Sequence, residues 1–411
     1  MRKQLYAVAS ILLSVLIFLV GNGLLGTLTP VRAHLNGFSD LVIGLIGSAY
    51  YVGFVLGCFT GPRLLARVGH SRTFAIAAGI AAVTPLLQSL FAAEWVWIVV
   101  RGLFGFAAAN LYMAIESWLN DRASNETRGR IFSAYMTVNF IGLIAGQWLY
   151  ATGRASSYSL FSLSAIAYAL CLIPVSMTRL PPPQTAAIPI LRPMRMYYSS
   201  PVGVAGCIAV GLANAAIWAL APIYAHDHHL TRGLLAAFMS AFTLGGAIIQ
   251  VPLGRLSDRM DRRVIIAGVC LAAAAAGVAL YFFGDRSRTV ALVLVAVYGV
   301  AMLPLYGLSV AHANDRLPRE MFVEASATLL LINAVASVAG PVLGAAVMAR
   351  EGSASLFLYT AFVHLGMAAF TVTRLATRDA PAEERREHFA PVPQQSSPVA
   401  AELDPRGAAQ G

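Results

Sequence analysis

Charged residues are scarce in this chain. Asp, Glu, Lys and Arg together make up 12% of its 411 residues, whereas hydrophobic residues make up 58% and the mean hydropathy is +0.69. A soluble domain cannot hide that much apolar surface in its interior. The composition therefore predicts an integral membrane protein.

Cysteine is rare as well, and no cysteine falls in a predicted loop. The four thiols lie inside apolar runs, at Cys58, Cys171, Cys207 and Cys270. That placement argues against a disulfide framework or a cysteine-rich metal cluster, and we expect small packing residues instead. The loop run His-Asp-His-His at 226–229 could attract an ion, but adjacent residues rarely converge on one ion without partners elsewhere. We predict no metal site and no cofactor.

Sequence signals of ATP hydrolysis and of catalysis are also missing. No GxxxxGK[ST] phosphate-binding loop occurs, so ATP is not expected to drive the protein. Inside the apolar runs we find neither a His-His-acid spacing nor a Ser-His pair, which argues against an intramembrane enzyme. A polytopic receptor stays open as an alternative, although a tail of about 33 residues is too short for a folded output domain.

Twelve charge-poor runs are long enough to cross a membrane, since roughly 20 apolar residues span roughly 30 Å of hydrocarbon. Only the fourth run contains a basic residue, Arg101. The runs are 5–31, 41–62, 73–93, 95–115, 131–153, 155–178, 196–225, 233–254, 264–284, 289–314, 325–349 and 352–373.

Basic residues are concentrated on one side of these predicted spans. With the N-terminus in the cytoplasm, 22 of the 29 Lys and Arg residues fall in inner segments. This bias predicts that both termini are cytoplasmic. The net charge of +10 is spread over the loops rather than gathered on one face, so we expect no nucleic-acid partner.

The chain contains a long internal repeat. Equivalent residues recur 192 positions apart early in each half and 194 positions apart later. The pairs include Asn22 and Asn214, Gly53 and Gly245, Arg67 and Arg259, Asp121 and Asp315, Asn139 and Asn333, and Gly146 and Gly340. A period this long indicates a duplicated domain, and many secondary transporters are built from duplicated bundles. Gly146 and Gly340 also belong to small-xxx-small runs, which predict close helix packing.

The repeat divides the chain into two six-span halves. We predict an N-terminal bundle at 1–179, an extended Pro-rich cytoplasmic linker at 180–197 and a C-terminal bundle at 198–377. Residues 378–411 are polar and Pro-rich without apolar periodicity, which predicts a disordered cytoplasmic tail. The expected fold class is an all-α membrane protein with twelve transmembrane helices in two six-helix bundles.

A loop motif links these halves to a known family. The run GRLSDRMDRR at 254–263 resembles the G-x-x-x-D-R-x-G-R-[RK] loop motif of the major facilitator superfamily. Its first-half counterpart, PRLLARVGHSR, keeps Arg67 but has Ala66 at the Asp position. In the family this Asp lies near the N-terminus of a helix in the opposite half, and its negative charge stabilises that contact while the cytoplasmic side is closed. The resemblance therefore implies a lopsided cytoplasmic gate, carried mainly by Asp258 and Arg259.

Further stretches support the resemblance over residues 5–375. Arg101 and the glycine after it are similar to the family's motif in helix four. Asp121 precedes Arg128 as in the family's acid-x6-Arg charge relay, which adds both residues to the implied gate. Gln147 stands where the antiporter motif has Pro, so that signal is incomplete. The runs ESWLNDRASNETRGRIFSAY and VAHANDRLP look most like the YcaD-like branch.

Ionisable residues inside a span are functional candidates because a charge in the membrane is costly. Arg101, Tyr112 and Glu116 fall within about 60° of one another on a helix and can line one cavity wall. Glu116 is our candidate for proton coupling, and the alternative is a structural pairing with Arg67 or Arg130. Arg101 could instead extend outward to the interface or bond to helix carbonyls.

Amides inside the spans are candidates for a substrate cavity. Asn22 and Asn214 are equivalent in the repeat, as are Asn139 and Asn333. In the family's arrangement of helices such pairs would face each other across the pseudo-twofold axis. Interhelical hydrogen bonding, worth about 0.6 kcal/mol each, is the alternative. Trp218 is an aromatic candidate of the same cavity.

The resemblance implies a secondary active transporter in a bacterial inner membrane, with two bundles rocking around one central site. Proton coupling is a hypothesis motivated by Arg101 and Glu116. Uptake of a small metabolite and efflux of amphipathic compounds are the two alternative interpretations of its function. The cavity candidates are mostly amides and aromatics with one cation, which suits an uncharged or anionic small-molecule solute. We expect a monomer in the lipid bilayer.

Overall fold

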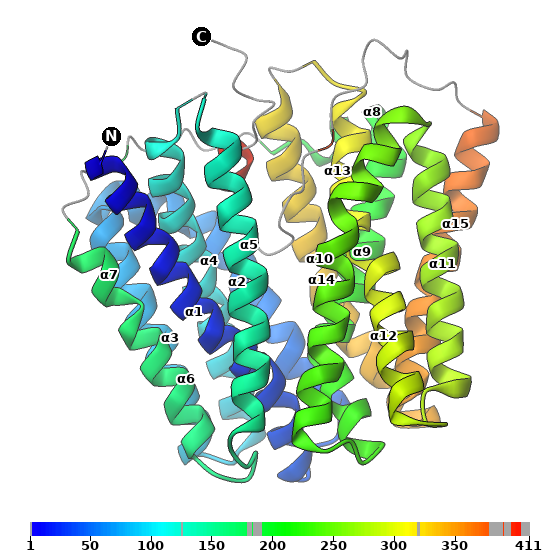
Figure 1. Ribbon diagram of the computed structural model, residues 1–411, viewed down its shortest axis with the longest axis horizontal. Coiled ribbons are helices and arrows are strands. Elements are labelled where there is room, and N and C mark those ends of the chain that lie inside the picture. Colours follow the sequence, from blue (N-terminus) through cyan, green and yellow to red (C-terminus); the bar gives the residue numbers. More distant parts are fainter. Residues whose placement is uncertain are drawn as a thin grey trace. The chain divides into compact units, whose positions relative to one another are not determined.

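The computed structural model describes residues 2–124, 126–178, 183, 191–318, 321–377, 389 and 396–403. All regular secondary structure in these ranges is helical (Figure 1). The chain forms two compact units: unit 1 comprises Met1–Pro189 and Gln395–Ala408, and unit 2 comprises Ile190–Gln394 and Ala409–Gly411.

Unit 1 is a helical bundle. Its elements are α1 (Arg2–Leu35), α2 (Asp40–Val68), α3 (His70–Leu90), α4 (Glu94–Arg122), α5 (Arg128–Ala151), α6 (Ser159–Leu170), α7 (Leu172–Ser176) and the 3-10 helix η3 (Pro398–Leu403). Helix α2 packs along α4, α1 packs along α5 and α6, and α3 packs against α4 and α6.

Unit 2 repeats this plan. Its elements are α8 (Pro193–Ser199), α9 (Pro201–Asp227), α10 (Arg232–Arg259), α11 (Arg262–Phe283), α12 (Arg288–Met302), α13 (Leu305–Asn314), α14 (Phe322–Glu351) and α15 (Ser355–Thr377). Helix α10 packs along α12, and α9 packs along α14, as α2 does along α4 and α1 along α5. The sequence repeat is therefore also a repeat of helix packing.

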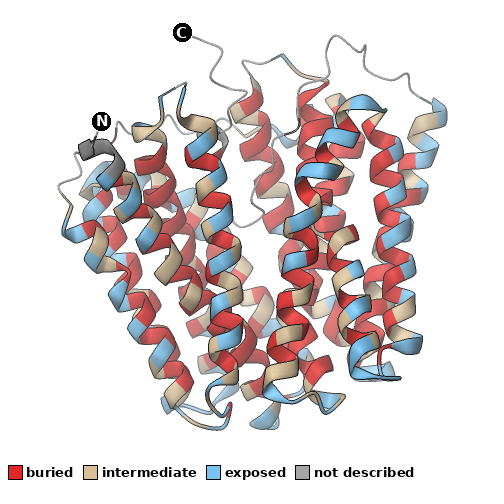
Figure 2. Ribbon diagram, in the orientation of Figure 1, coloured by how far each residue is buried: buried red, intermediate tan, exposed pale blue. Residues whose placement is uncertain are grey.

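Eleven helical segments in the described ranges are long and apolar enough to cross a membrane. Each of the twelve predicted spans coincides with a helix or with two consecutive short helices. The span outside the set of eleven is α5, where Asn139, Gln147 and Trp148 lower the hydropathy. Exposed residues are distributed along these helices (Figure 2). They include many large apolar ones, as expected for helices surrounded by lipid.

Glycines bring the paired helices into backbone contact. A Cβ atom on Gly53 of α2 would overlap the Gly102 carbonyl oxygen of α4, and one on its repeat partner Gly245 would overlap the Ala296 carbonyl oxygen of α12. Similar overlaps would occur at three of the four small-xxx-small glycines, and at the fourth, Gly344, a Cβ would lie 3.1 Å from the Ala216 Cβ. The predicted close packing at those positions is confirmed, since Gly146 meets the Val20 carbonyl and Gly340 the Leu212 carbonyl.

Gly53→Ala is expected to destabilise the protein by about 1–3 kcal/mol, because the added methyl group must push α2 away from α4. Thermal melting of the purified protein in detergent would measure the loss. The matched control is Gly79→Ala in α3, where a Cβ would meet nothing within 4 Å. Equal melting temperatures for the two variants would contradict a close contact at Gly53.

The structure departs from the predicted spans where the chain turns. The tenth span is divided into α12, which ends at Met302, and α13, which begins at Leu305. Pro304 lies in the break between them, and proline has no N–H to donate to the hydrogen bonds of a helix. The predicted extended linker, 180–197, is wrong at its end, since Pro193 begins helix α8 and proline suits the first helical turn. Most of the remaining linker lies outside the described residues.

The predicted disordered tail, 378–411, also needs correction. Its described residues are Phe389 and 396–403, and the latter include the 3-10 helix η3. Ser396 and Ser397 are buried against unit 1 rather than solvated. The rest of the predicted tail lies outside the described residues.

The four cysteines are all described and are all free thiols. Three of them are buried, and Cys58 is half-buried. Their placement in the bundles confirms the expectation of small packing residues.

Candidate functional site

Helix α4 carries three of the predicted site residues in unit 1. Glu94 in its first turn and Arg122 in its last turn suit the two ends of the helix dipole. No proline interrupts its 29 residues. A single uninterrupted helix therefore carries Arg101, Tyr112 and Glu116.

Arg101 lies among aromatic rings. Its guanidinium carbon is 5.1 Å from the ring centre of Tyr50 and 5.0 Å from that of Phe104. Cation–π attraction of this kind holds a guanidinium without neutralising it. The Nη1 atom is buried and has no hydrogen-bond partner in the described part of the chain. Arg101 therefore keeps an unused donor and a positive charge inside the bundle.

The rings continue from Arg101 toward Tyr112. Phe18 of α1 meets the Tyr112 ring edge-on at 5.4 Å, and Tyr168 of α6 lies 5.3 Å from Phe104. Tyr50 and Tyr168 both lie close enough to Arg101 to interact with its charge. Helices α1, α2, α4 and α6 thus meet in one aromatic cluster, which sequence spacing on α4 alone could not reveal.

Tyr112 connects the aromatic cluster with Glu116. Its side chain is only 1% exposed and lies within electrostatic reach of both Tyr50 and Glu116. The Tyr112 hydroxyl makes no hydrogen bond of ordinary geometry in the described residues, and the Asn22 amide is its polar neighbour. The predicted grouping of Arg101, Tyr112 and Glu116 on one face is consistent with these contacts.

Glu116 is completely buried, and its carboxylate accepts three hydrogen bonds. The Tyr135 hydroxyl of α5 donates to Oε1 at 2.9 Å. The backbone N–H and the hydroxyl of Ser397 donate to Oε2 at 2.8 and 2.6 Å. The alternative pairing with Arg67 or Arg130 is wrong in this structure, since no ion pair joins Glu116 to an arginine among the described residues.

The predicted asparagines are all buried. In unit 1, the Asn139 amide donates to the Tyr135 carbonyl of its own helix at 2.8 Å. In unit 2, the Oδ1 atom of Asn333 has no hydrogen-bond partner in the described ranges. Asn214 is fully buried in α9, and Trp218 on the same helix meets Phe242 edge-on at 5.3 Å. Whether these residues face a substrate stays a prediction.

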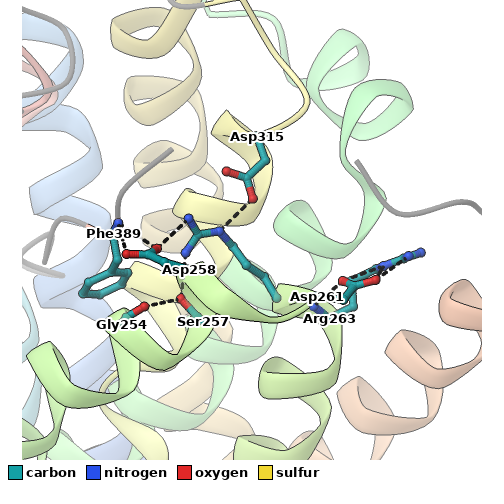
Figure 3. A network of polar contacts seen from close by, with 8 residues as sticks. Gly254, Ser257, Asp258, Asp261, Arg263, Asp315 and Phe389 are labelled. Carbon is teal, nitrogen blue, oxygen red and sulfur yellow. Dashed lines mark hydrogen bonds and ion pairs between the residues drawn. The ribbon is translucent and has the colours of Figure 1, made fainter. Parts of the chain in front are cut away.

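A charged network occupies the α10–α11 turn of unit 2 (Figure 3). Arg262, the first residue of α11, donates to Asp315 at 2.7 Å and pairs with Asp258 at 2.9 Å. It also donates to the Ser257 hydroxyl at 2.7 Å. The Arg262 side chain is 1% exposed, and such a charge is tolerated in the interior only when it is paired and hydrogen-bonded.

Asp258 also contacts the C-terminal tail. Both of its carboxylate oxygens accept from the Phe389 N–H, at 2.9 and 3.1 Å (Figure 3). The Phe389 ring lies against Gly254, where an added Cβ would overlap it. Asp258 therefore bridges the α10–α11 turn and the tail within unit 2.

Asp261 caps the start of α11. Its carboxylate accepts from the Arg263 backbone N–H at 2.9 Å and pairs with the Arg263 guanidinium at 2.7 Å (Figure 3). Burial by itself would raise the pKa of this carboxyl, but the hydrogen bonds from Arg263 hold the pKa below its ordinary value. Asp261 replaces the usual glycine of the loop motif, and here it acts as a helix cap.

The predicted gate in unit 2 needs one correction. Arg259 is exposed and takes no part in the network, whereas Arg262 is its centre. Asp315 and Arg262 were missed as site residues. A signal was present, because Asp315 is the repeat partner of Asp121 and Arg262 belongs to the loop motif.

The equivalent place in unit 1 is poorer in charge. Ala66 and Arg67 are exposed, and His70, packed against the Trp118 ring, stands where the repeat places Arg262. Asp121 pairs with the neighbouring Arg122 at 3.3 Å. No ion pair joins Asp121 to Arg128 among the described residues, and the relay between them stays a prediction. The expected asymmetry of the two halves is consistent with these contacts.

Two bacterial relatives match most of the chain. It is 23% identical over 355 residues to the uncharacterized MFS-type transporter YcaD of Escherichia fergusonii, covering 86% of this chain and 92% of the relative. An uncharacterized MFS-type transporter of Yersinia pestis is 24% identical over 362 residues, covering 87% and 94%. The predicted likeness to the YcaD-like branch is confirmed.

Solved structures show the same fold. The nucleoside transporter NupG superposes with a TM-score of 0.73 at 15% identity, covering 91% of this chain and 99% of NupG. A bacterial homolog of the human lysosomal transporter Spinster gives a TM-score of 0.72 at 13% identity, covering 95% and 100%. At these identities the likeness establishes the fold alone.

A family model decides the assignment. The model described as Major Facilitator Superfamily matches residues 11–195 and 203–405, which is nearly the whole chain. The two repeated helical units and the loop motif at 254–263 agree with that match. The chain therefore belongs to the major facilitator superfamily and is a multi-pass membrane protein, a secondary transporter and not an enzyme.

Proposed function

We propose that this transporter moves a small organic solute across the bacterial inner membrane by alternating access, in exchange for or together with protons. The observation that carries the proposal is Arg101, a half-buried cation whose buried Nη1 atom has no hydrogen-bond partner among the described residues and which lies among aromatic rings. Such surroundings suit an acidic or acceptor group attached to an apolar or aromatic body. Glu116 on the same helix would carry the proton.

The membrane and orientation follow from separate arguments. The relatives come from bacteria with an inner membrane, and the excess of arginine in alternate loops favours cytoplasmic termini. Proton coupling also occurs within this fold, since the D-xylose-proton symporter superposes with a TM-score of 0.68. We propose that the protein acts as a monomer without a nucleic-acid partner or cofactor. Asp258, Arg262 and Asp315 would form the stronger half of its cytoplasmic gate.

Transport itself is tested in proteoliposomes. A screen of solutes by their effect on the melting temperature would first identify ligands of the purified protein. Counterflow of the radiolabelled solute should then exceed that of empty liposomes, and the direction driven by an imposed pH gradient separates uptake from efflux of amphipathic compounds. Binding without counterflow would indicate a receptor and contradict the proposal.

Arg101→Ala is expected to weaken solute binding by about 100-fold, because a charged hydrogen bond and its cation–π surroundings contribute about 1.5–3 kcal/mol. Titration of the ligand-induced melting shift would measure it. Arg154→Ala, which alters an outer-loop arginine, is the control and should bind normally. If binding by the Arg101 variant were unchanged, Arg101 would be a structural residue.

A further inference from the structure

The C-terminal tail enters the site that the proposed function assigns to proton coupling. Ser397 is 1% exposed, and Val399 and Ala400 beside it are buried in unit 1. Helix η3, which follows Ser397, packs against α4. The tail is polar and Pro-rich, yet these residues are buried in unit 1 instead of exposed to water.

Ser397 supplies most of the polar surroundings of Glu116. Two of the three hydrogen bonds to the Glu116 carboxylate come from Ser397, and both go to Oε2. The Ser397 hydroxyl oxygen also accepts from the Val399 N–H at 3.2 Å, which fixes its orientation. An unpaired buried carboxylate is very costly. Glu116 and the tail therefore stabilise each other in this conformation.

A second tail residue contacts a second carboxylate. The Phe389 N–H donates to the Asp258 carboxylate, and the Phe389 ring packs against Gly254. Eight positions along the chain separate Phe389 from Ser397. Phe389 and Ser397 thus each contact a carboxylate within their own unit, one in the predicted gate and the other on the candidate for proton coupling.

We propose that tail residues 396–400 form an autoinhibitory segment, and that the pocket around Glu116 in unit 1 is its binding site. This inference rests on the proposed function for its effect on transport, but not for the binding itself. While Ser397 holds Oε2, Glu116 cannot exchange a proton with water. Release of the tail exposes the carboxylate and permits the cycle.

Truncation tests the effect on transport. A chain ending at Thr377 should transport about tenfold faster than the full chain, and Ser397→Asp should raise the rate similarly, since a second carboxylate repels Glu116. A chain ending at Leu403 keeps Ser397 and is the control, with an unchanged rate. Equal rates in the full chain and the chain ending at Thr377 would overturn the autoinhibition.

Peptide binding tests the site without relying on transport. A labelled peptide of residues 395–403 should bind the chain ending at Thr377 in detergent, as fluorescence anisotropy would show, and should slow its transport. The same peptide with Ser397→Asp should bind at least tenfold more weakly, corresponding to about 1.4 kcal/mol. If both peptides bound equally, the assignment of the Glu116 site would be wrong. If the two peptides bound with different affinities but no variant transported any solute, the proposed function would be wrong and the binding site would still be supported.

Discussion

Glu116→Gln is expected to abolish the response of transport to a pH gradient while leaving solute binding in place. The glutamine amide has the same shape, and its one carbonyl oxygen can accept from Ser397 while its NH2 group donates to the Tyr135 hydroxyl, but it cannot carry a proton. Counterflow, which needs no proton driving force, should continue, whereas accumulation driven by an imposed pH gradient should stop. Uptake into proteoliposomes with and without the gradient measures both.

The control for this variant is Glu94→Gln. Glu94 is exposed at the other end of α4, so its substitution should leave gradient-driven transport unchanged. Both variants should also be measured in the chain ending at Thr377, because the contact of Ser397 with Glu116 would otherwise complicate the comparison. Full gradient-driven accumulation by the Glu116→Gln variant would show that the proton travels elsewhere, or that the transporter is not proton-coupled.

Asp315→Asn is expected to lower the free energy of unfolding by about 3–5 kcal/mol, because it leaves the buried Arg262 guanidinium short of one of its two carboxylates. Denaturant or thermal unfolding in detergent measures the loss. Since Asp315 is 2% exposed, water cannot replace the missing partner.

The repeat supplies a matched control for this prediction. Asp121 is the equivalent residue of unit 1, but it is 33% exposed and 3.3 Å from Arg122. Asp121→Asn should therefore cost less than about 1 kcal/mol. Equal losses at the two positions would mean that the unit 2 network contributes no more than a surface ion pair. The Asp315 variant should also change the rate of transport if the network is part of the gate.

The membrane fold could be predicted from sequence because its signals are local. An apolar run must satisfy its own backbone hydrogen bonds in lipid, so length and composition are enough to predict each helix. The duplicated positions then predict the pairing of helices, and the glycines of the repeat mark the contacts. Gly53 and Gly245 have the same role in their units for this reason.

The gate residues show where such reasoning stops. Motif position favoured Arg259, yet Arg262 makes the ion pairs. Helix α10 ends at Arg259, and α11 begins at Arg262 after a short break. The direction of each side chain depends on that break, and no periodicity in the sequence describes it.

Sequence alone determined that this protein has twelve predicted spans in two duplicated halves, with Arg101 and Glu116 on one helix face, because hydropathy, helical angles and repeated residues can all be read without knowing how the chain packs. Only the tertiary structure decided what surrounds those two side chains. Tyr50 and Phe104 enclose Arg101, and Ser397, 281 positions beyond Glu116, bonds to its carboxylate. Contacts across such separations are set by the packing of whole helices and by the demand of a buried charge for partners, which no local pattern records.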